Sequence, residues 1–222
     1  GQCIKLADYD QLALSNTNRI VSPVANLGTL KVYATARMLY EINPYMTVEV
    51  FPEGISSANI GDFLGGNCPL DIIIDELDNL AMKYLIREHA QKRKLPIVMA
   101  ADNADSSVVD IERYDMDAKT NFFHGRMGDA SYESLSKLDK MGIGKMIAKH
   151  IGVENITERM SKSLTEIGKT IVSWPQLGGT ALLSGVAVAY CVRKILTDQE
   201  IESNRGILSL DKELIPSYTT TS

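Results

Sequence analysis

Short apolar runs bounded by turn residues alternate with longer stretches of helical periodicity through the first half of the chain. This alternation is typical of an α/β fold, in which helices flank a mainly parallel sheet. We predict strands at residues 4–7, 47–51, 70–75, 95–101 and 107–114. The helices predicted between them cover residues 26–42, 60–64 and 79–93. The continuous apolar run "LDIIID" (70–75) is expected to form a strand buried on both faces.

The second half of the chain is predicted to be mostly helical. Helices are expected at residues 131–150, 155–170 and 180–196, with a break at "SWPQLGG" (173–179) and a late strand at 206–210. We therefore predict a core at residues 1–121 and a mostly helical C-terminal portion at residues 122–222 that packs on the same domain.

Charge and cysteine content limit the classes of partner. The formal net charge is -5, so no basic surface is expected for nucleic acid or anionic lipid. Cys3, Cys68 and Cys191 are widely spaced and odd in number, which favours free structural thiols in a reducing compartment over a disulfide framework or a zinc cluster. The apolar run at 181–189 is too short to span a bilayer. We expect a soluble cytoplasmic protein with no membrane and no nucleic-acid partner.

The motif "LADYD" places Asp8 directly after the first predicted strand. Ligands of open α/β sheets bind at the carboxyl ends of the strands, and an acidic side chain there can accept hydrogen bonds from both ribose hydroxyls of a nucleotide. A solvated loop carboxylate or a helix cap explains Asp8 taken alone equally well.

The following "SNTNR" offers Asn16, Asn18 and Arg19, which combine amide donors with a guanidinium suited to phosphate oxygens. Ordinary turn chemistry also accounts for the asparagines. Lys31 lies in the first turns of the helix predicted from residue 26, where its ammonium could supplement the positive helix end towards a phosphate. A solvent-facing lysine is the simpler alternative.

The motif "DELDN" follows the predicted buried strand at 70–75, so Asp75 and Asp78 are expected at the same carboxyl edge as Asp8. A carboxylate in this position can hold Mg²⁺ against a triphosphate, because Mg²⁺ binds one or two carboxylates together with phosphate and water oxygens. Asp78 or Asn79 could also cap the helix that begins there. The cap and the metal ligand are compatible roles.

Three stretches in this order, "LADYDQLALSNTNR", "GTLKVYATARMLYEINPYMTVEV" and "LDIIIDELDNLAMKYLIREHAQKRKLPIVMAA", resemble the ThiF/MoeB family, the bacterial relatives of ubiquitin-activating enzymes. The resemblance covers about residues 1–115, and the late "SWPQLGGTALLSGVAVAYCVRKIL" is similar to the closing segment of divergent ThiF-like proteins. It implies a Rossmann-like fold that binds Mg-ATP and adenylates a C-terminal carboxylate. The usual substrate is a small ubiquitin-like protein, and pyrophosphate is released.

The resemblance also implies roles for individual residues. Asp8 would bind the ribose, Asn16 and Arg19 the phosphates, and Lys31 the phosphates during attack. Asp78 would bind Mg²⁺, with Asn79 beside it at the nucleotide. Attack on the α-phosphate builds negative charge that Arg19, Lys31 and the metal would stabilise, which makes Arg19, Lys31 and Asp78 the predicted catalytic residues. A homodimer or heterodimer is implied because relatives pair through this domain.

Three departures from the family pattern bear on activity. The resemblance implies a first strand and a Gly-rich turn before Gly1; the sequence is a fragment, has lost upstream residues, or receives this unit from a partner chain. Glu76 and Leu77 replace a small or polar pair. No cysteine lies between Cys68 and Cys191, where relatives that form a thioester carry their thiol, so adenylation is expected without thiol transfer.

Two other functions remain open. The first is a non-catalytic ThiF-like scaffold or partner-binding subunit. The second is an NAD-dependent oxidoreductase, which Asp8 would permit but which "SNTNR" and "DELDN" disfavour. The histidines suggest no metal site: His124 is predicted to be partly buried and structural, and His89 and His150 are predicted to lie on the surface.

Overall fold

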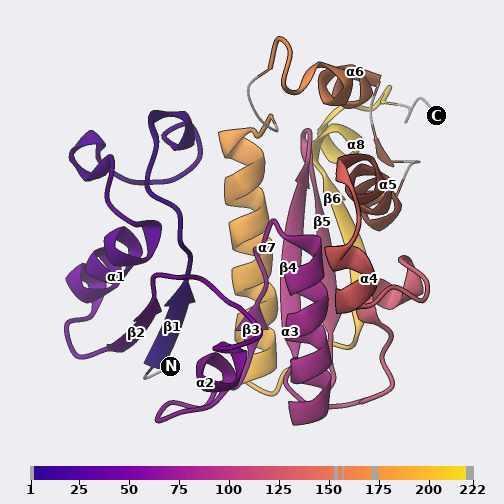
Figure 1. Ribbon diagram of the computed structural model, residues 1–222. Coiled ribbons are helices and arrows are strands. Elements are labelled where there is room, and N and C mark those ends of the chain that lie inside the picture. The colour runs from indigo at the N-terminus through magenta and orange to yellow at the C-terminus, as the bar shows by residue number, and fades with distance from the viewer. Residues whose placement is uncertain (1–2, 153–154, 157, 172–174, 219–222) are drawn as a thin grey trace. The chain divides into compact units, whose positions relative to one another are not determined.

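The computed structural model describes residues 3–152, 155–156, 158–171 and 175–218. The chain forms two compact units, Gly1–Leu70 and Asp71–Ser222 (Figure 1). Part of the predicted break at 173–179 lies outside the described residues. The predicted boundary after residue 121 stays a prediction.

The first unit is built on two parallel strands joined by a helical crossover (Figure 1). Its elements are β1 (Cys3–Ala7), η1 (Leu14–Asn16), η2 (Val24–Asn26), α1 (Lys31–Ile42), β2 (Thr47–Phe51) and α2 (Ile60–Leu64). The register runs from Cys3 opposite Thr47 to Ala7 opposite Phe51. Parallel neighbours require such a crossover because a tight turn can join only antiparallel strands. Both strands therefore end at one edge, where β1 leads into the loop that carries Asp8.

Helix α1 begins at Lys31, later than the predicted start at residue 26. Gly28 has a φ of 83°, in the left-handed region that glycine adopts without strain, and this residue separates η2 from α1. The backbone around it is bonded to the preceding loop, since Gly28 N donates to Leu12 O at 2.8 Å and Lys31 N donates to Asp10 O at 2.9 Å. Lys31 is therefore the first residue of the helix.

Cys3 and Cys68 form a disulfide, with their Cα atoms 6.5 Å apart. The bond ties the start of β1 to the loop after α2. The buried Lys5 ammonium makes a second connection, because it donates to Asp62 O at 3.2 Å near the C-terminal end of α2. The prediction of free thiols is wrong for this pair: the fold brings together two cysteines 65 positions apart, and their spacing in the sequence does not reveal this.

The second unit contains a four-stranded sheet in the order β3-β4-β5-β6. Its elements are β3 (Ile73–Ile74), α3 (Leu80–Arg93), β4 (Ile97–Asn103), β5 (Ser106–Glu112), η3 (Phe122–Gly125), α4 (Tyr132–Ser136), α5 (Lys140–Ile151), α6 (Glu158–Glu166), α7 (Gly178–Leu196), β6 (Asn204–Ser209) and α8 (Leu210–Leu214). Strands β3 and β4 are parallel, and β5 and β6 join antiparallel. The predicted α/β class, with parallel strands and flanking helices, is confirmed.

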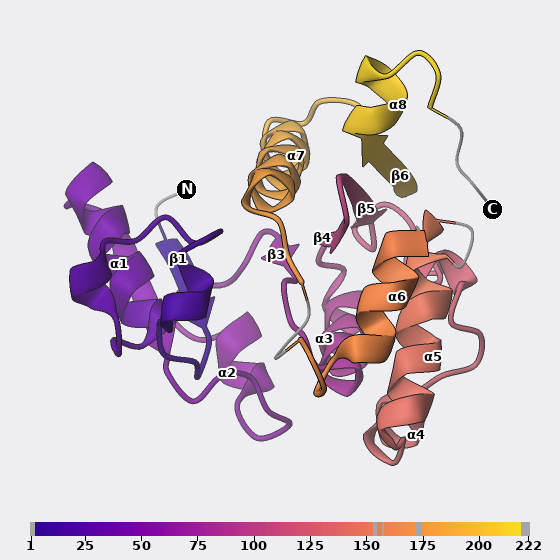
Figure 2. The same cartoon turned by 90° about the horizontal axis from the view of Figure 1, so that it is seen from above.

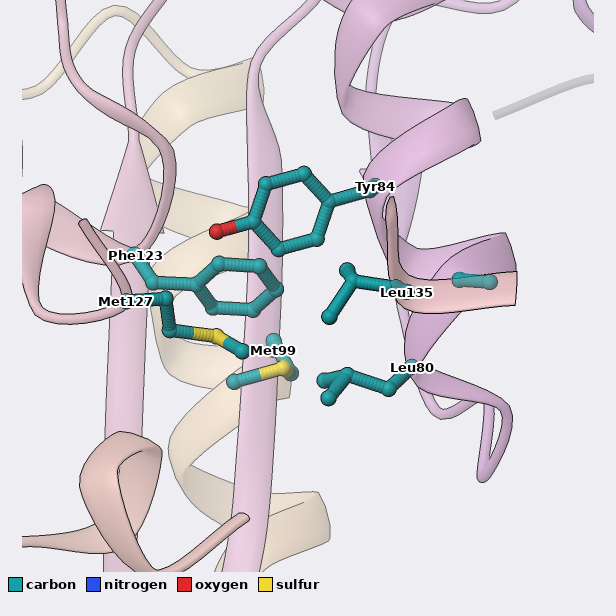
Figure 3. Packing of buried hydrophobic residues seen from close by; sticks show 7 residues of the cluster. Leu80, Tyr84, Met99, Phe123, Met127 and Leu135 are labelled. Atoms are coloured by element: carbon teal, nitrogen blue, oxygen red, sulfur yellow. The ribbon is translucent and has the colours of Figure 1, made fainter. Parts of the chain in front are cut away.

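Side chains of β4 and β5 alternate between two helical layers, with α7 on one side of the sheet and α3, α5 and α6 on the other (Figure 2). Val98, Ala100, Val109 and Ile111 pack with α7. Met99 packs on the opposite side with the cluster shown in Figure 3, which contains Leu80, Ala81, Tyr84, Phe123, Met127 and Leu135. The core of this unit is therefore two apolar layers separated by the sheet.

Strand β3 is shorter than the predicted strand at 70–75, and it is not buried on both faces. It pairs with β4 only through Ile73 opposite Ile97 and Ile74 opposite Val98. Ile74 is 52% exposed, and β3 is an outermost strand in the order β3-β4-β5-β6. An apolar run alone does not distinguish an edge strand from a central one.

The predicted helix at 131–150 is two helices, α4 and α5. The Asp139 side chain accepts a hydrogen bond from Gly142 N at 2.8 Å, so Asp139 caps a new helix within the predicted one. The prediction at 155–170 corresponds to the shorter α6, and α8 was not predicted.

Helix α7 is long and apolar enough, by length and composition, to cross a membrane, and it is the single such helix in the described part of the chain. The run at 181–189, predicted to be too short, is only its central part. One face of α7 packs on the sheet through Val188, Cys191 and Ile195, and Cys191 is a buried free thiol as predicted. Leu182 on another face is 59% exposed.

Candidate functional site

Asp8 and Lys31 lie together at the end of β1. The Asp8 side chain folds over its own loop, where Oδ1 accepts a hydrogen bond from Asp10 N at 2.8 Å. Its Oδ2 lies 3.8 Å from Lys31 Nζ, and Asp10 Oδ2 lies 2.7 Å from the same ammonium. Asp10 was missed in the sequence, although its place two residues after Asp8 put it in the same loop.

The Lys31 ammonium can exchange its partners for a phosphate. The side chains of Lys31, Asp8 and Asp10 are all partly exposed, and exposed ion pairs stabilise a protein by only about 0 to 1 kcal/mol. Lys31 also begins α1, where the positive helix end favours anions. The Asp8 carboxylate suits the ribose hydroxyls of a nucleotide, and the Lys31 ammonium beside it suits the phosphate oxygens.

Asn16 and Arg19 are engaged within their own loop. Asn16 is buried, and its Oδ1 accepts a hydrogen bond from Ala13 N at 2.9 Å, so it shapes the η1 turn. Arg19 Nη1 donates to Ser15 O at 2.9 Å and to Asn18 Oδ1 at 3.0 Å. These contacts use one terminal nitrogen of Arg19, and its guanidinium carries further donors.

In the second unit, three side chains shape the turn after β3. Asp75 Oδ1 accepts a hydrogen bond from Leu77 N at 3.1 Å, and Glu76 Oε1 accepts one from Ala100 N of β4 at 3.3 Å. Asn79 is the N-cap of α3, with its Oδ1 accepting from Met82 N at 3.1 Å. The helix-cap role predicted for this motif is thus taken by Asn79.

Asp78 is exposed in this turn, and no ion pair involves it among the described residues. The same part of the chain contains no group of three or more His, Cys, Asp or Glu side chains that could hold a metal ion by themselves. An available carboxylate fits Mg²⁺, which keeps several waters and binds proteins through one or two carboxylates together with phosphates. It does not fit a metal that requires a complete set of protein ligands.

Asp75 belongs to a buried cluster of charges that the sequence prediction missed. Its Oδ1 lies 3.1 Å from Lys83 Nζ and its Oδ2 lies 2.5 Å from Arg87 Nη1. Arg87 Nε lies 2.7 Å from Glu112 Oε2, and the side chains of Asp75, Arg87 and Glu112 are fully buried. Arg87 lies three residues after the buried Tyr84, so on a helix both side chains lie on the face that points to the core.

Burial and charge act in opposite directions on these carboxyls. Burial by itself would raise the pKa of Asp75, but Lys83 and Arg87 outweigh it and hold the pKa below its usual value. Burial raises the pKa of Glu112, and Arg87 offsets only part of this increase. Asp75 is therefore the firmly ionised partner of Arg87.

His150 is buried, so the prediction that it lies on the surface is wrong. It packs edge-on against Phe123, with ring centroids 4.9 Å apart, and its Nε2 lies 3.9 Å from Asp110 Oδ2. Burial, and next the charge of Arg205, lower the pKa of His150 to about 3. His124 is partly buried as predicted, with its Nε2 3.6 Å from Asp110 Oδ1. The Lys and Arg residues around His150 in the sequence concealed its core-facing position.

The parallel strands with flanking helices, and the acidic side chains that follow β1 and β3, define an α/β protein of the Rossmann type. The family model described as "ThiF family" matches residues 2–213, and the chain belongs to this family. The predicted family is thereby confirmed.

Two curated relatives match the chain over most of its length. The chain is 33% identical to the uncharacterized protein MT1398 of Mycobacterium tuberculosis over 92% of this chain and 28% of that protein. It is 26% identical to a probable molybdopterin-synthase adenylyltransferase of Porphyra purpurea over 96% of this chain and 52% of that protein. The chain thus spans about a quarter and about a half of these curated relatives.

Solved structures show the same fold. The structure of E. coli MccB with ATP matches with a TM-score of 0.56 and 15% identity over 94% of this chain and 56% of that chain. A structure of MccB with MccA-N7isoASN has a TM-score of 0.58 and 14% identity, with coverage of 94% and 57%.

Proposed function

We propose that this chain is the nucleotide-binding part of a ThiF-family adenylyltransferase that activates the C-terminal carboxylate of a protein or peptide with Mg-ATP. The observation that carries the proposal is the pairing of Asp8 with Lys31 at the end of β1, in a chain matched over residues 2–213 by the ThiF family. Support for ATP comes from MccB, which was solved with ATP, and support for adenylyl transfer comes from the Porphyra purpurea relative.

The residues have distinct chemical tasks in this proposal. Asp8 accepts hydrogen bonds from the ribose, and Asn16 and Arg19 contact the phosphates. Lys31 leaves Asp10 to neutralise the charge that builds on the α-phosphate during attack. Asp78, next to the cap residue Asn79, holds Mg²⁺, which when bound draws charge from the phosphate oxygens.

The proposal includes partners and location. The acceptor is a ubiquitin-like protein or peptide carboxyl terminus, and MccB, solved with MccA-N7isoASN, is the supporting relative. The working form is a homodimer or heterodimer. A cytoplasmic location is part of the proposal, with no membrane or nucleic-acid partner. Because disulfides are rare in the cytosol, Cys3 and Cys68 would be largely reduced there.

Pyrophosphate exchange tests this function directly. The protein in its natural full length is incubated with ATP, Mg²⁺, labelled pyrophosphate and a panel of peptides with free carboxyl termini, and label entering ATP is counted. Lys31→Ala and Asp78→Asn are each expected to lower exchange about 100-fold, because Lys31 neutralises negative charge in the transition state and Asp78 would hold the Mg²⁺ that does the same. Matched controls are Lys92→Ala and Asp71→Asn, which change exposed side chains of the same types.

A protein that binds ATP in calorimetry but shows no exchange with any peptide would be a non-catalytic ThiF-like scaffold, the alternative function. Binding of NADH, detected by its fluorescence, would instead support the oxidoreductase that the acidic end of β1 permits.

A further inference from the structure

The turn that carries Asp78 is shaped by a side chain that does not itself face solvent. Asp75 N donates to Val98 O at 3.0 Å, which is the last bond of this turn's backbone to β4. The Asp75 carboxylate then accepts a hydrogen bond from Leu77 N at 3.1 Å. This bond sets the direction in which the chain leaves the sheet. The position of Asp78 therefore depends on the orientation of the Asp75 carboxylate.

Arg87 fixes that orientation from inside the unit. Its Nη1 contacts Asp75 Oδ2 at 2.5 Å, its Nε lies 2.7 Å from Glu112 Oε2, and its guanidinium lies 3.7 Å from the centre of the Phe123 ring. Glu112 is held in turn, since its Oε1 accepts from Phe123 N at 2.6 Å. The planar guanidinium is thus clamped between the ends of two strands and an aromatic ring.

Stability alone is a poor explanation for this arrangement. Burying each ion costs several kcal/mol, and well-packed apolar residues in place of a buried ion pair are often equally or more stabilising. A buried, planar guanidinium that lies against a different carboxylate on each of two sides does supply geometric precision, because it limits the directions in which both carboxylates can lie. Lys83 adds a second positive charge at 3.1 Å from Asp75 but remains partly exposed.

We infer that Arg87 is a positioning residue for the magnesium ligand: through Asp75 it holds the turn from Glu76 to Asn79 and so fixes the position of the Asp78 carboxylate. This inference rests on the proposed function, in which Asp78 binds Mg²⁺. The Arg87 side chain is fully buried, so in this inference it acts only through the turn. Residues that orient a metal ligand typically change metal affinity about 10- to 100-fold when they are replaced.

The test compares Arg87→Lys with Arg93→Lys in the natural full-length protein. Arg87→Lys keeps the charge and removes the planar guanidinium that reaches both carboxylates, whereas Arg93 is exposed on the same helix. Two quantities are measured: hydrogen exchange of the Leu77 amide, and the Mg²⁺ concentration for half-maximal pyrophosphate exchange. For Arg87→Lys we expect Leu77 to exchange about tenfold faster and the Mg²⁺ requirement to rise about tenfold. Arg93→Lys should match the wild type in both.

Asp75→Asn is the second variant, because the asparagine keeps the shape and can still accept the Leu77 amide while losing its charge. It remains informative if Arg87→Lys does not fold. Wild-type Leu77 exchange in the folded variants would overturn the inference. So would faster Leu77 exchange with an unchanged Mg²⁺ requirement, which is the result expected of a purely structural Arg87. Absence of pyrophosphate exchange in the wild type would remove the proposed function, and Leu77 exchange would still report whether Arg87 holds the turn.

Discussion

Individual buried ionisable residues of the second unit link its stability to pH. His150 is enclosed by Phe123, Asp110 and the start of β6, where Arg205 pairs with Asp110 at 2.7 Å. The Arg205 guanidinium also donates to the His150 carbonyl oxygen. A cation so close to a buried imidazole disfavours a second positive charge, so His150 is neutral in the folded protein at neutral pH.

The first prediction concerns acid destabilisation. The pKa of His150 is about 3 when folded and about 6.5 when exposed, so the unfolded state binds the extra proton between these values. The contribution of His150 is complete above pH 6.5 and is lost as the pH falls towards 3, by at most about 1.4 kcal/mol per pH unit. Denaturant titrations at pH 8.0, 6.5 and 5.0 should show that His150→Gln loses less free energy of unfolding than the wild type below pH 6.5.

The difference between wild type and variant isolates His150 from the carboxyl groups around it, which titrate in both proteins. Near pH 8 this difference should no longer change with pH, because the imidazole is neutral in both the folded and the unfolded state. Parallel curves for the two proteins down to pH 5 would show that His150 is not the residue responsible.

The sequence predicted residues with local roles better than residues whose partners are distant. Asn79 follows a strand and precedes a helical pattern, so its capping role was visible. Arg87 contacts Glu112, 25 positions later in the chain (112 − 87), and a surface arginine is the usual expectation on a helix. The roles predicted for Asp8, Lys31 and Asp78 at a nucleotide stay predictions.

Among the elements, α7 combines an apolar composition with a clear division between faces. Ser184 Oγ donates to Asp102 Oδ1 at 2.6 Å and lies 2.8 Å from Ser107 Oγ, so polar contacts between helix and sheet fix its rotation. Val188 and Ile195 are buried on the same side. An all-apolar helix could otherwise pack on the sheet with almost any face.

The second prediction tests which face of α7 is packed. Ile195→Ala should lower the free energy of unfolding by about 2 to 4 kcal/mol, since it leaves a cavity against the sheet. Leu182→Ala, the matched control on the same helix, should change it by less than about 0.5 kcal/mol because Leu182 is 59% exposed. Both values come from urea unfolding at one pH. Equal losses for the two variants would contradict the packing of Ile195 against the sheet.

Element boundaries depended on contacts outside each segment. The late start of α1 follows from Gly28 and from the pairing of the loop with Leu12, which no periodicity within residues 26–42 could show. The exposure of Ile74 in β3 depends on which elements pack over its face of the strand, and the apolar run at 70–75 does not show this. Strands with their own alternating pattern, such as Thr47–Phe51, were predicted with the correct bounds.

At the scale of the whole molecule, the chain has two units with separate sources of stability. The disulfide between Cys3 and Cys68 lies entirely within Gly1–Leu70. The two apolar clusters on either side of the four-stranded sheet lie entirely within Asp71–Ser222. The sequence predicted the fold class and family, but it gave no sign of this disulfide, because cysteine spacing does not determine pairing.

The third prediction is that reduction acts on the first unit alone. Closing a loop of about 65 residues stabilises a chain by about 4 kcal/mol through the entropy of its unfolded state, so reductant should speed hydrogen exchange at the amides of β1 and β2. Amides of β4 and β5 should keep their protection from exchange, since no disulfide joins the first unit to their clusters.

The number of thiols titrated in the denatured protein should rise from one to three with reductant. Cys191→Ser should behave like the wild type, and Cys3→Ser with Cys68→Ser should reproduce the reduced pattern without reductant. Equal loss of protection in β4 and β5 would mean that the two units unfold together, and unchanged exchange in fully reduced protein would mean that the disulfide adds no stability.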